Sequence, residues 1–551
     1  MSNKFLETMG NISETENGAF GYKSTFDPMV DFSFRLASYR GANQGKIEED
    51  FVKILDSKDE DVLRFLFYIR DARDGLGERR TFKICLKKFI TSDFDDKEKI
   101  IEHLCNYIME YGRADDLFCL LDDDVDVSIR NIVYRFIYNT LIHDEVALAK
   151  KESVSLLAKW LPSENASSKK TKELATKIRK NINLSPKTYR KALSSLRKGL
   201  KIVERDMSAN EWGKIDYNSV PSRANLNYKK AFLKHDEERR KQYLTDLANG
   251  VKGVKMNSSV NFPYDIVHKY YDELELGYWS RGTDSLKEDE TLEMAWKNLK
   301  DIPGLDNCLI VADDSGSMTA EISSASKVSA LDVARSIAIY GAQHLRGDYN
   351  GKIVTFSETP KFLDISKKKK LKDILEYLDK HSEVANTNVE AVFDLILKVA
   401  VSKNLKQEDL PETLVIISDM EFDCCVRDSD NFKFGVFNNP VEVAREKFKK
   451  NGYKLPKLVF WNVASRTGTI PLEQNDFGFL LISGFSQNLF NGVAAGKLDT
   501  REMLNEVLTS ERYSKIEKII FKKDVDKEDY YDIIIIGMKE SGESPTPCTL
   551  T

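Results

Sequence analysis

The pattern of apolar residues changes once along the chain, near residue 300, and this change limits the folds open to it. Before that point apolar side chains recur every three or four residues, for example in segments 48–73 and 127–153, which predicts helices with one buried face. Segment 185–205 opens with Ser185 and Pro186, residues typical of the first turn of a helix. The first half is therefore expected to be mainly helical.

After about residue 304 short apolar runs alternate with helical segments. Strands are predicted over 306–314, 352–357, 413–420, 457–465 and 477–485, and helices between them and over 501–519. Continuous apolar strands that alternate with helices are typical of a parallel sheet with helices on both faces. We expect a doubly wound α/β domain, which would bind its ligand at the carboxyl ends of the strands.

The predicted fold is multidomain, with an all-α solenoid or irregular bundle followed by an α/β domain. The predicted boundaries are an extended arm at 1–45, the helical module at 46–300, the α/β domain at 301–540 and a disordered tail at 541–551. The 551 residues are 41% hydrophobic, which is enough for ordinary cores. No fixed repeat period is present. Gly75 and Gly77 predict a tight turn between two helices.

Composition excludes several classes of protein. No apolar stretch approaches the roughly 18 to 20 residues of a membrane helix, and the N-terminus lacks the apolar segment of a secretory signal. The seven cysteines have no C-x-x-C spacing, and the six histidines show no zinc-binding pattern. We expect a cytoplasmic protein. Without a phosphate-binding loop or a nucleophile elbow, we do not expect an enzyme.

Polar residues gather where the predicted strands end. Asp313, Ser315 and Ser317 follow the first strand as D-x-S-x-S, and Asp419 ends a later one. Thr387 stands just before a helix. Oxygen ligands from three loops, without His or Cys, favour a hard divalent cation such as Mg²⁺, with one position left for an outside carboxylate or phosphate. The alternative is an ordinary strand-to-helix loop with polar caps.

Positive charge is concentrated in one part of an acidic chain. The formal net charge is −5, yet residues 151–250 contain 23 Lys and Arg against 11 Asp and Glu. The candidate RNA-binding residues are Lys187, Arg190, Lys191, Arg197, Lys198 and Lys201 in one cluster, and Lys229, Lys230, Lys234 and His235 in another. Aromatic side chains such as Tyr217 and Phe232 lie among them, for stacking on bases or for packing between helices. The block is either a polyanion site or a set of solvated helix faces.

The second half resembles a von Willebrand factor A domain with its metal-ion-dependent adhesion site. The resemblance rests on VADDSGSM at 311–318, on Thr387-Asn388 before a helix, and on ISDM at 417–420. It implies that Ser315, Ser317 and Thr387 bind the metal directly, and that Asp313 and Asp419 do so directly or through water. Met420 stands where many members of that family have a glycine.

The first half resembles the TROVE-like helical module of proteins related to the Ro autoantigen. The motifs are TENGAFGYKSTFDPMVDFSF (15–34), RDARDGLGERRTF (70–82), EYGRADDLF (110–118), LSPKTYRKALSSLRKGLKIVERDMS (184–208) and KKAFLKHDEERRKQYL (229–244). The resemblance implies a ring of HEAT-like repeats. Such a ring binds small noncoding RNA on a basic outer surface, takes the ends of misfolded RNAs into its hole, and forms a ribonucleoprotein.

Three functions are consistent with these patterns. The first is an RNA-binding protein whose A domain holds Mg²⁺ and a partner's carboxylate, and it predicts salt-sensitive binding to RNA. The second is a metal-dependent protein-interaction scaffold that does not bind RNA. The third is a metal-dependent phosphodiesterase, whose activity would be lost in Asp313→Ala.

Overall fold

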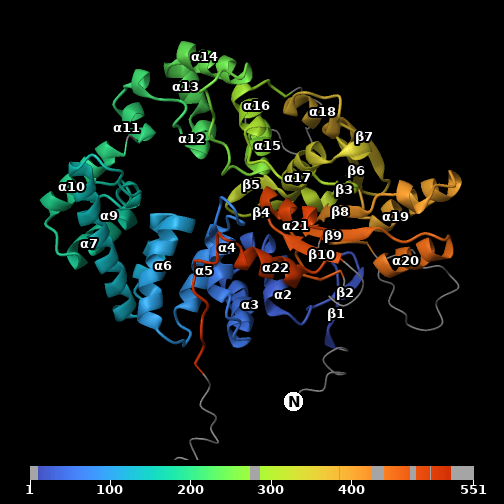
Figure 1. Ribbon diagram of the computed structural model, residues 1–551, viewed down its shortest axis with the longest axis horizontal. Helices are drawn as coiled ribbons and strands as arrows, with labels where there is room; N and C mark the ends of the chain where they lie inside the picture. The colour runs from blue at the N-terminus through green and yellow to red at the C-terminus, as the bar shows by residue number, and fades with distance from the viewer. Residues whose placement is uncertain are drawn as a thin grey trace, which may run out of the picture.

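The computed structural model describes residues 10–200, 202–272, 286–383, 385–423, 440–471, 479–496 and 498–522. The chain is mainly helical up to about residue 300, as predicted (Figure 1). Its longer helices are α3 (Gln44–Asp56), α4 (Val62–Arg70), α5 (Arg79–Phe89), α6 (Lys97–Tyr111), α7 (Val127–Ala149), α9 (Lys169–Asn181), α10 (Pro186–Gly199), α14 (Glu237–Ala248), α15 (Pro263–Asp272) and α16 (Glu290–Lys297). Shorter ones are α8 (Leu157–Trp160), α11 (Val203–Ser208), α12 (Ser222–Asn227) and α13 (Lys229–His235).

The remaining chain forms an α/β part with a mixed sheet of six strands. The strands of this sheet are β3 (Cys308–Asp313), β6 (Lys352–Phe356), β7 (Lys361–Asp364), β8 (Thr413–Ser418), β9 (Lys457–Asn462) and β10 (Phe479–Ser483). Its main helices are α17 (Ala330–His344), α18 (Leu371–His381), α19 (Val389–Ser402), α20 (Pro440–Lys450), α21 (Phe490–Ala494) and α22 (Thr500–Thr509). A small hairpin, β4 (Glu321–Ser323) and β5 (Ser326–Ser329), follows the first strand.

The strand order across the sheet is β10-β9-β8-β3-β6-β7. All neighbouring pairs are parallel except β6 and β7, which are antiparallel. The sequence predicted a parallel sheet and did not predict β7. The reason is that β7 is a short edge strand, and Phe362 points a 59% exposed ring away from the core, so the segment has no continuous apolar run.

Both faces of the sheet are covered by helices, and successive residues of a strand enter different cores. On β3, Ile310 and Ala312 belong to a large core that includes α17 and α21, whereas Leu309 and Val311 face a smaller core with α19 and α20. The alternation follows from the period of two in a strand. The large core continues without interruption into the helical part, so the two parts are packed as one body.

The helices of the first part follow an arc, and the α/β part contacts both ends of it (Figure 1). At one end, α2 (Pro28–Phe34) packs on β10 and α22, and α4 packs on α22. At the other end, α15 packs on α17 and α16 packs on α18. Helices α9 and α10, midway along the arc, both pack on α7.

The segment predicted as an extended arm, residues 1–45, is folded where the structure describes it. Residues Ile12–Glu14 (β1) and Phe20–Tyr22 (β2) form a hairpin that adds to the α/β part through a bridge from Tyr22 to Ile470. Asp27 then caps α2, whose apolar side chains are buried. The expectation was wrong for this segment because its polar residues occur in turns around a short apolar helix.

The chain after α22 also differs from the prediction. The helix predicted over 501–519 ends at Thr509, and residues 510–522 return across α4 and α6. The Glu517 carboxylate accepts a hydrogen bond from the Tyr107 hydroxyl, and the backbone N–H of Ile519 donates to the backbone oxygen of Glu60 at 2.8 Å. The predicted tail, 541–551, lies outside the described residues. Among the helices that the structure describes, none has the length and apolar character needed to cross a lipid bilayer.

Candidate functional site

The candidate metal site lies at the carboxyl end of β3, between β6 and β8. The chain leaves β3 to form β6 on one side and later β8 on the other, so this is the point where the strand order reverses. Ligands of open α/β sheets bind at such a point. Asp313 ends β3, Asp419 directly follows β8, and Thr387 precedes α19.

Asp313 is fully buried and held by its neighbours. Its carboxylate accepts hydrogen bonds from the Ser418 hydroxyl at 2.6 Å and from the backbone N–H of Ser315 at 2.9 Å. Burial and repulsion from Asp419 raise the pKa of the Asp313 carboxyl, and its hydrogen bonds only partly oppose this. The two carboxyl groups are therefore close enough to influence each other.

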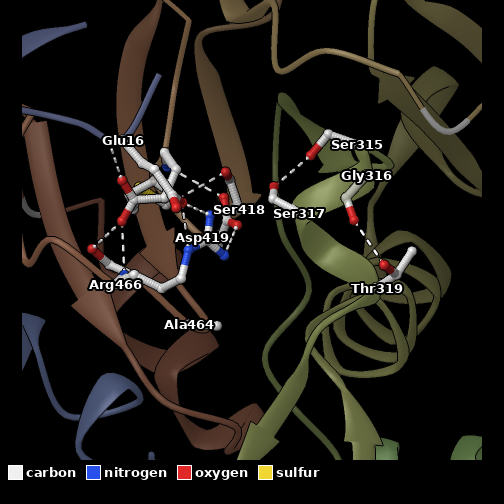
Figure 2. A network of polar contacts seen from close by, with 12 residues as sticks. Glu16, Ser315, Gly316, Ser317, Thr319, Ser418, Asp419, Ala464 and Arg466 are labelled. Carbon is white, nitrogen blue, oxygen red and sulfur yellow. Dashed lines mark hydrogen bonds and ion pairs between the residues drawn. The ribbon is translucent and has the colours of Figure 1, made fainter. Parts of the chain in front are cut away.

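Hydroxyl groups stand beside this pair of carboxyl groups. The Ser315 and Ser317 hydroxyl oxygens are 3.1 Å apart, and Figure 2 shows them pointing toward each other. Asp419 is fully buried, and its pKa is raised by burial although Arg466 and the Ser317 hydroxyl favour the charged form. Ser317, in the loop after β3, thus reaches the aspartate that follows β8.

Arg466, from the segment after β9, covers Asp419 on the other side. Its guanidinium contacts the Asp419 carboxylate at 3.2 Å and also pairs with Glu16 in the turn of the N-terminal hairpin (Figure 2). The N-terminal segment, far away in the sequence, is therefore part of the wall of the site.

Thr387 reaches the site through its loop. Its side chain is buried, and its backbone oxygen accepts from the N–H of Asp423 at 3.0 Å. Two residues earlier, the Ala385 oxygen accepts from the N–H of Gly316 at 3.0 Å. The structure thus brings the Thr387 loop against the loop of Ser315 and Ser317, so all five predicted residues gather at one edge.

Met420, which follows Asp419, adopts a backbone conformation that usually favours glycine. It has a φ of 62°, in the left-handed region that glycine adopts most easily, and its side chain is buried. The backbone thus has the shape that a glycine would favour, and the Met420 side chain gains apolar contact in the smaller core.

Glu421 is a buried residue of the site that the sequence analysis did not single out. Its carboxylate accepts hydrogen bonds from the backbone N–H groups of Glu16, Arg466 and Thr467, at 2.8, 2.7 and 2.9 Å. It therefore fixes both the hairpin and the segment that bears Arg466. Only its position, two residues after Asp419, could have indicated in the sequence that it belongs to the site. Acidic residues are too frequent in this chain for such a position to identify a site residue.

The donor set fits a hard cation. Two carboxylates and three hydroxyls supply oxygen alone, which suits Mg²⁺ and disfavours softer metals. Asp313, Ser315, Ser317, Thr387 and Asp419 are the residues that would hold it. Among the described residues, no group of three or more His, Cys, Asp or Glu side chains is placed to hold a metal, so the hydroxyls would be essential to this site.

The basic block forms an exposed surface on α9 and α10, here named the α9–α10 surface. Its exposed cations are Lys170, Lys172, Lys180, Lys187, Arg190, Lys191 and Lys198. None of these seven has a carboxylate partner in the part of the chain that the structure describes. Tyr189, by contrast, is buried on the inner side of α10 and donates to the Pro162 oxygen at 2.9 Å.

Two predicted RNA-binding residues are used inside the protein instead. Arg197 donates to the backbone oxygens of Ala158 and Leu161 at 2.8 and 2.7 Å, which anchors α10 to the turn around α8. Lys229 is 3% exposed and pairs with Asp289. Sequence could not separate them from their exposed neighbours because both partners are remote. Lys201 lies outside the described residues.

The second predicted cluster is small. Lys230, Lys234 and His235 are exposed on α13, where the His235 ring stacks on Trp212 with centroids 4.5 Å apart. Phe232 is fully buried, and Tyr217 is 4% exposed. These two rings pack between helices rather than standing free to stack on bases.

A groove of about 720 Å³ borders the α9–α10 surface. Arg190 and Arg205 line it together with Lys159, and Glu164 and Glu204 are its acidic residues. Arg197 forms part of its floor. The exposed cations of α10 therefore continue into a concave region rather than ending on a flat helix face.

Two family models of unknown function each match a part of this chain. The family described as Domain of unknown function (DUF7788) matches residues 307–532, and that described as Domain of unknown function (DUF2828) matches residues 131–302. An uncharacterized protein of Acanthamoeba polyphaga mimivirus is 28% identical over 539 residues, which cover 91% of this chain and 88% of the viral protein. The similarity to the viral protein thus extends over both the helical and the α/β parts.

Proposed function

We propose that the protein binds RNA through the α9–α10 surface. The observation that supports this is a group of seven exposed cations on two consecutive helices of an acidic protein, none of which has a carboxylate partner among the described residues. Phosphate contacts by such side chains release counterions, which gives affinity without base recognition. A structured noncoding RNA with a single-stranded end is the proposed ligand, and binding rather than catalysis is the proposed activity.

The overall architecture agrees with the resemblance to Ro-related proteins. The helices follow an arc, and the α/β part meets both of its ends, as expected if a HEAT-like solenoid is closed by an A domain (Figure 1). The curved helical part presents α9 and α10 midway between these ends. The proposed compartment is the cytoplasm, on the sparse cysteines of the sequence.

The test is RNA binding across a salt series, with a structured RNA that has a single-stranded end and duplex DNA as ligands. The variant carries Lys187→Gln, Arg190→Gln, Lys191→Gln and Lys198→Gln. We expect the wild-type protein to bind the RNA more tightly than the duplex DNA. The slope of log affinity against log salt concentration should be smaller by about 3 in the variant than in the wild type. RNA cleavage that requires Mg²⁺ and is lost in Asp313→Ala would instead favour a phosphodiesterase.

The matched control removes four exposed lysines from the α/β part, namely Lys398, Lys403, Lys449 and Lys450. It changes the net charge by the same amount and should leave the salt slope unaltered. Equal losses in both variants would mean that only overall charge matters, and the proposed surface would be wrong.

As a second candidate function, we propose that the α/β part is a von Willebrand A domain that holds Mg²⁺ and captures a carboxylate of a partner protein. The oxygen donors gathered around Asp313 and Asp419 at the strand-order reversal support it. The metal would neutralise the buried pair and leave a coordination position for the partner.

Thermal unfolding with and without MgCl₂ tests this second candidate. An ion bound only by the folded state raises stability by about 2.7 kcal/mol at a hundred times its dissociation constant. Ser317→Ala removes one hydroxyl oxygen and should abolish the Mg²⁺-dependent shift, whereas Ser402→Ala, at an exposed position at the end of α19, should keep it. The same shift in both variants would exclude this site.

A further inference from the structure

A cavity of about 830 Å³ lies between the N-terminal segment and the α/β part, beside the candidate metal site. Its wall comes from residues 23–53, from β4 and from residues 464–468. Both Ser317 and Arg466 line it. This volume is within the range of small-molecule sites, and a concave pocket between two parts of a protein is a common place for one.

The wall of this cavity is positively charged. Its cations are Lys23, Arg35, Lys46, Lys53 and Arg466, and its carboxylates are Asp31 and Glu321. Asp31 is already satisfied, since it accepts hydrogen bonds from the Thr25 N–H at 2.8 Å and hydroxyl at 2.7 Å. Because the lining side chains include more cations than carboxylates, the cavity favours an anion over a cation.

The cations of the wall are incompletely neutralised by the protein. Arg35 donates only to backbone oxygens in the part of the chain that the structure describes, those of Lys23 and Gly468. Lys46 and Lys53 share one carboxylate, that of Asp50, at 3.1 and 2.8 Å. Because Arg35 has no carboxylate partner among the described residues, and Lys46 and Lys53 have only one between them, these three cations keep an excess of positive charge for a ligand.

An aromatic ring and an unpaired hydroxyl complete the wall. Phe26 lines the cavity with a 57% exposed ring, held at a φ of 64° that bulky residues rarely adopt. The Ser38 hydroxyl is buried at the cavity and has no hydrogen-bond partner among the described residues. An exposed ring in a strained turn and an unsatisfied buried hydroxyl both call for an explanation, and a bound ligand provides one.

We propose that this cavity binds a nucleoside phosphate, with the phosphate at Arg35 and the lysines and the base stacked on Phe26. Cations beside an exposed aromatic ring suit a ligand that has both an anionic group and a flat π-face. A cavity of about 830 Å³ suits a small ligand. The nucleoside phosphate is either a free nucleotide or the phosphorylated end of an RNA, and the inference does not require the α9–α10 surface.

The test is calorimetric titration of the full chain with AMP, adenosine, inorganic phosphate and a 5′-phosphorylated RNA tetranucleotide. AMP is expected to bind at least tenfold more tightly than adenosine or phosphate. Phe26→Ala should weaken binding about tenfold through lost stacking, and Lys53→Gln severalfold. Lys53 is 60% exposed, so its variant should fold normally.

Matched controls are Phe362→Ala, whose ring is 59% exposed on β7, and Lys403→Gln on the α/β surface. Both should bind AMP as the wild type does. Binding of the tetranucleotide alone, with the same loss in Phe26→Ala, would identify the source as an RNA end. Failure of both AMP and the tetranucleotide to bind at millimolar concentration, or unaltered binding in Phe26→Ala and Lys53→Gln, would overturn the proposal.

Discussion

At the scale of single residues, Asp116 is the charged group on which the packing of α4, α5 and the chain after α6 depends. It is fully buried and accepts from Arg70 at 2.7 Å and Arg79 at 2.9 Å, with Lys83 at 3.3 Å. Arg70 is itself buried. Removing the carboxylate would leave a buried guanidinium without its counter-charge, which is far more destabilising than losing an exposed pair.

We therefore predict that Asp116→Asn lowers the free energy of unfolding by about 3 to 5 kcal/mol at pH 7, measured by urea denaturation. Burial raises the pKa of Asp116, but Arg70, Arg79 and Lys83 outweigh it and hold the pKa below its usual value. The stabilisation is thus fully present above the unfolded pKa of about 3.9 and is lost as the pH falls through the lower folded pKa. The gap between wild type and variant should narrow toward pH 3.

Asp122→Asn is the control for this prediction, because the Asp122 carboxylate is 57% exposed and pairs with Lys87 at 3.1 Å. It should change stability by less than about 1 kcal/mol. A similar loss in both variants would show that burial of the Asp116 network contributes little.

At the scale of elements, local sequence patterns were sufficient to predict where most helices and strands form. Helix α10 begins at Pro186 with Ser185 as its cap, whose hydroxyl accepts from the Thr188 N–H at 3.1 Å, as the sequence predicted. The five predicted strands are present because each is a continuous apolar run. Local patterns also placed Asp313 and Asp419 at strand ends, which is why the candidate metal residues could be chosen in advance.

Contacts between remote segments were not predictable in this way. The pairing of Arg466 with Glu16 joins residues about 450 positions apart, and Glu421 fixes both segments. Arg197 and Lys229 look like their exposed neighbours in sequence, yet each has a partner on another element. Periodicity reports which face of an element is buried, but it does not report what that face meets.

The turn between α4 and α5 is an element whose shape requires glycine. A Cβ atom on Gly75 would lie 2.1 Å from the Tyr68 backbone oxygen, and the Gly75 oxygen accepts from Ser486 at 2.8 Å and Asn488 at 2.9 Å. The turn, predicted from sequence as a tight connection, thus also joins the helical and α/β parts. We predict that Gly75→Ala destabilises the protein by about 1 to 3 kcal/mol, measured by chemical denaturation.

Gly213→Ala serves as the comparison, since a Cβ there would meet no atom within 4 Å. It should leave the denaturation midpoint nearly unchanged or slightly raised. If Gly75→Ala were equally harmless, the turn would be able to relax, and its contacts with Ser486 and Asn488 would not form a fixed junction between the two parts.

At the scale of the whole molecule, segments near both ends of the described residues join the two parts. The N-terminal hairpin adds to the α/β part through the bridge between Tyr22 and Ile470, whereas residues 510–522 return to the helical part. One hydrophobic core runs through both. Cooperative unfolding in a single transition is the expected consequence, because neither part can open without exposing the shared core.

The returning segment, residues 510–522, provides the test of this coupling. Its side chains Tyr513, Ile516 and Ile519 are buried, and its Arg512 pairs with Asp71 at 2.8 Å. At about 1.5 to 3 kcal/mol for each buried side chain, a chain that ends after residue 509 should lose on the order of 5 kcal/mol of stability or more. A chain that ends after residue 522 retains these contacts and serves as the control. If the shorter chain loses the single transition, and its helical and α/β signals unfold separately in denaturant, the segment couples the two parts. If the denaturation midpoints are unchanged in both chains, the shared core is sufficient to couple the parts without the segment.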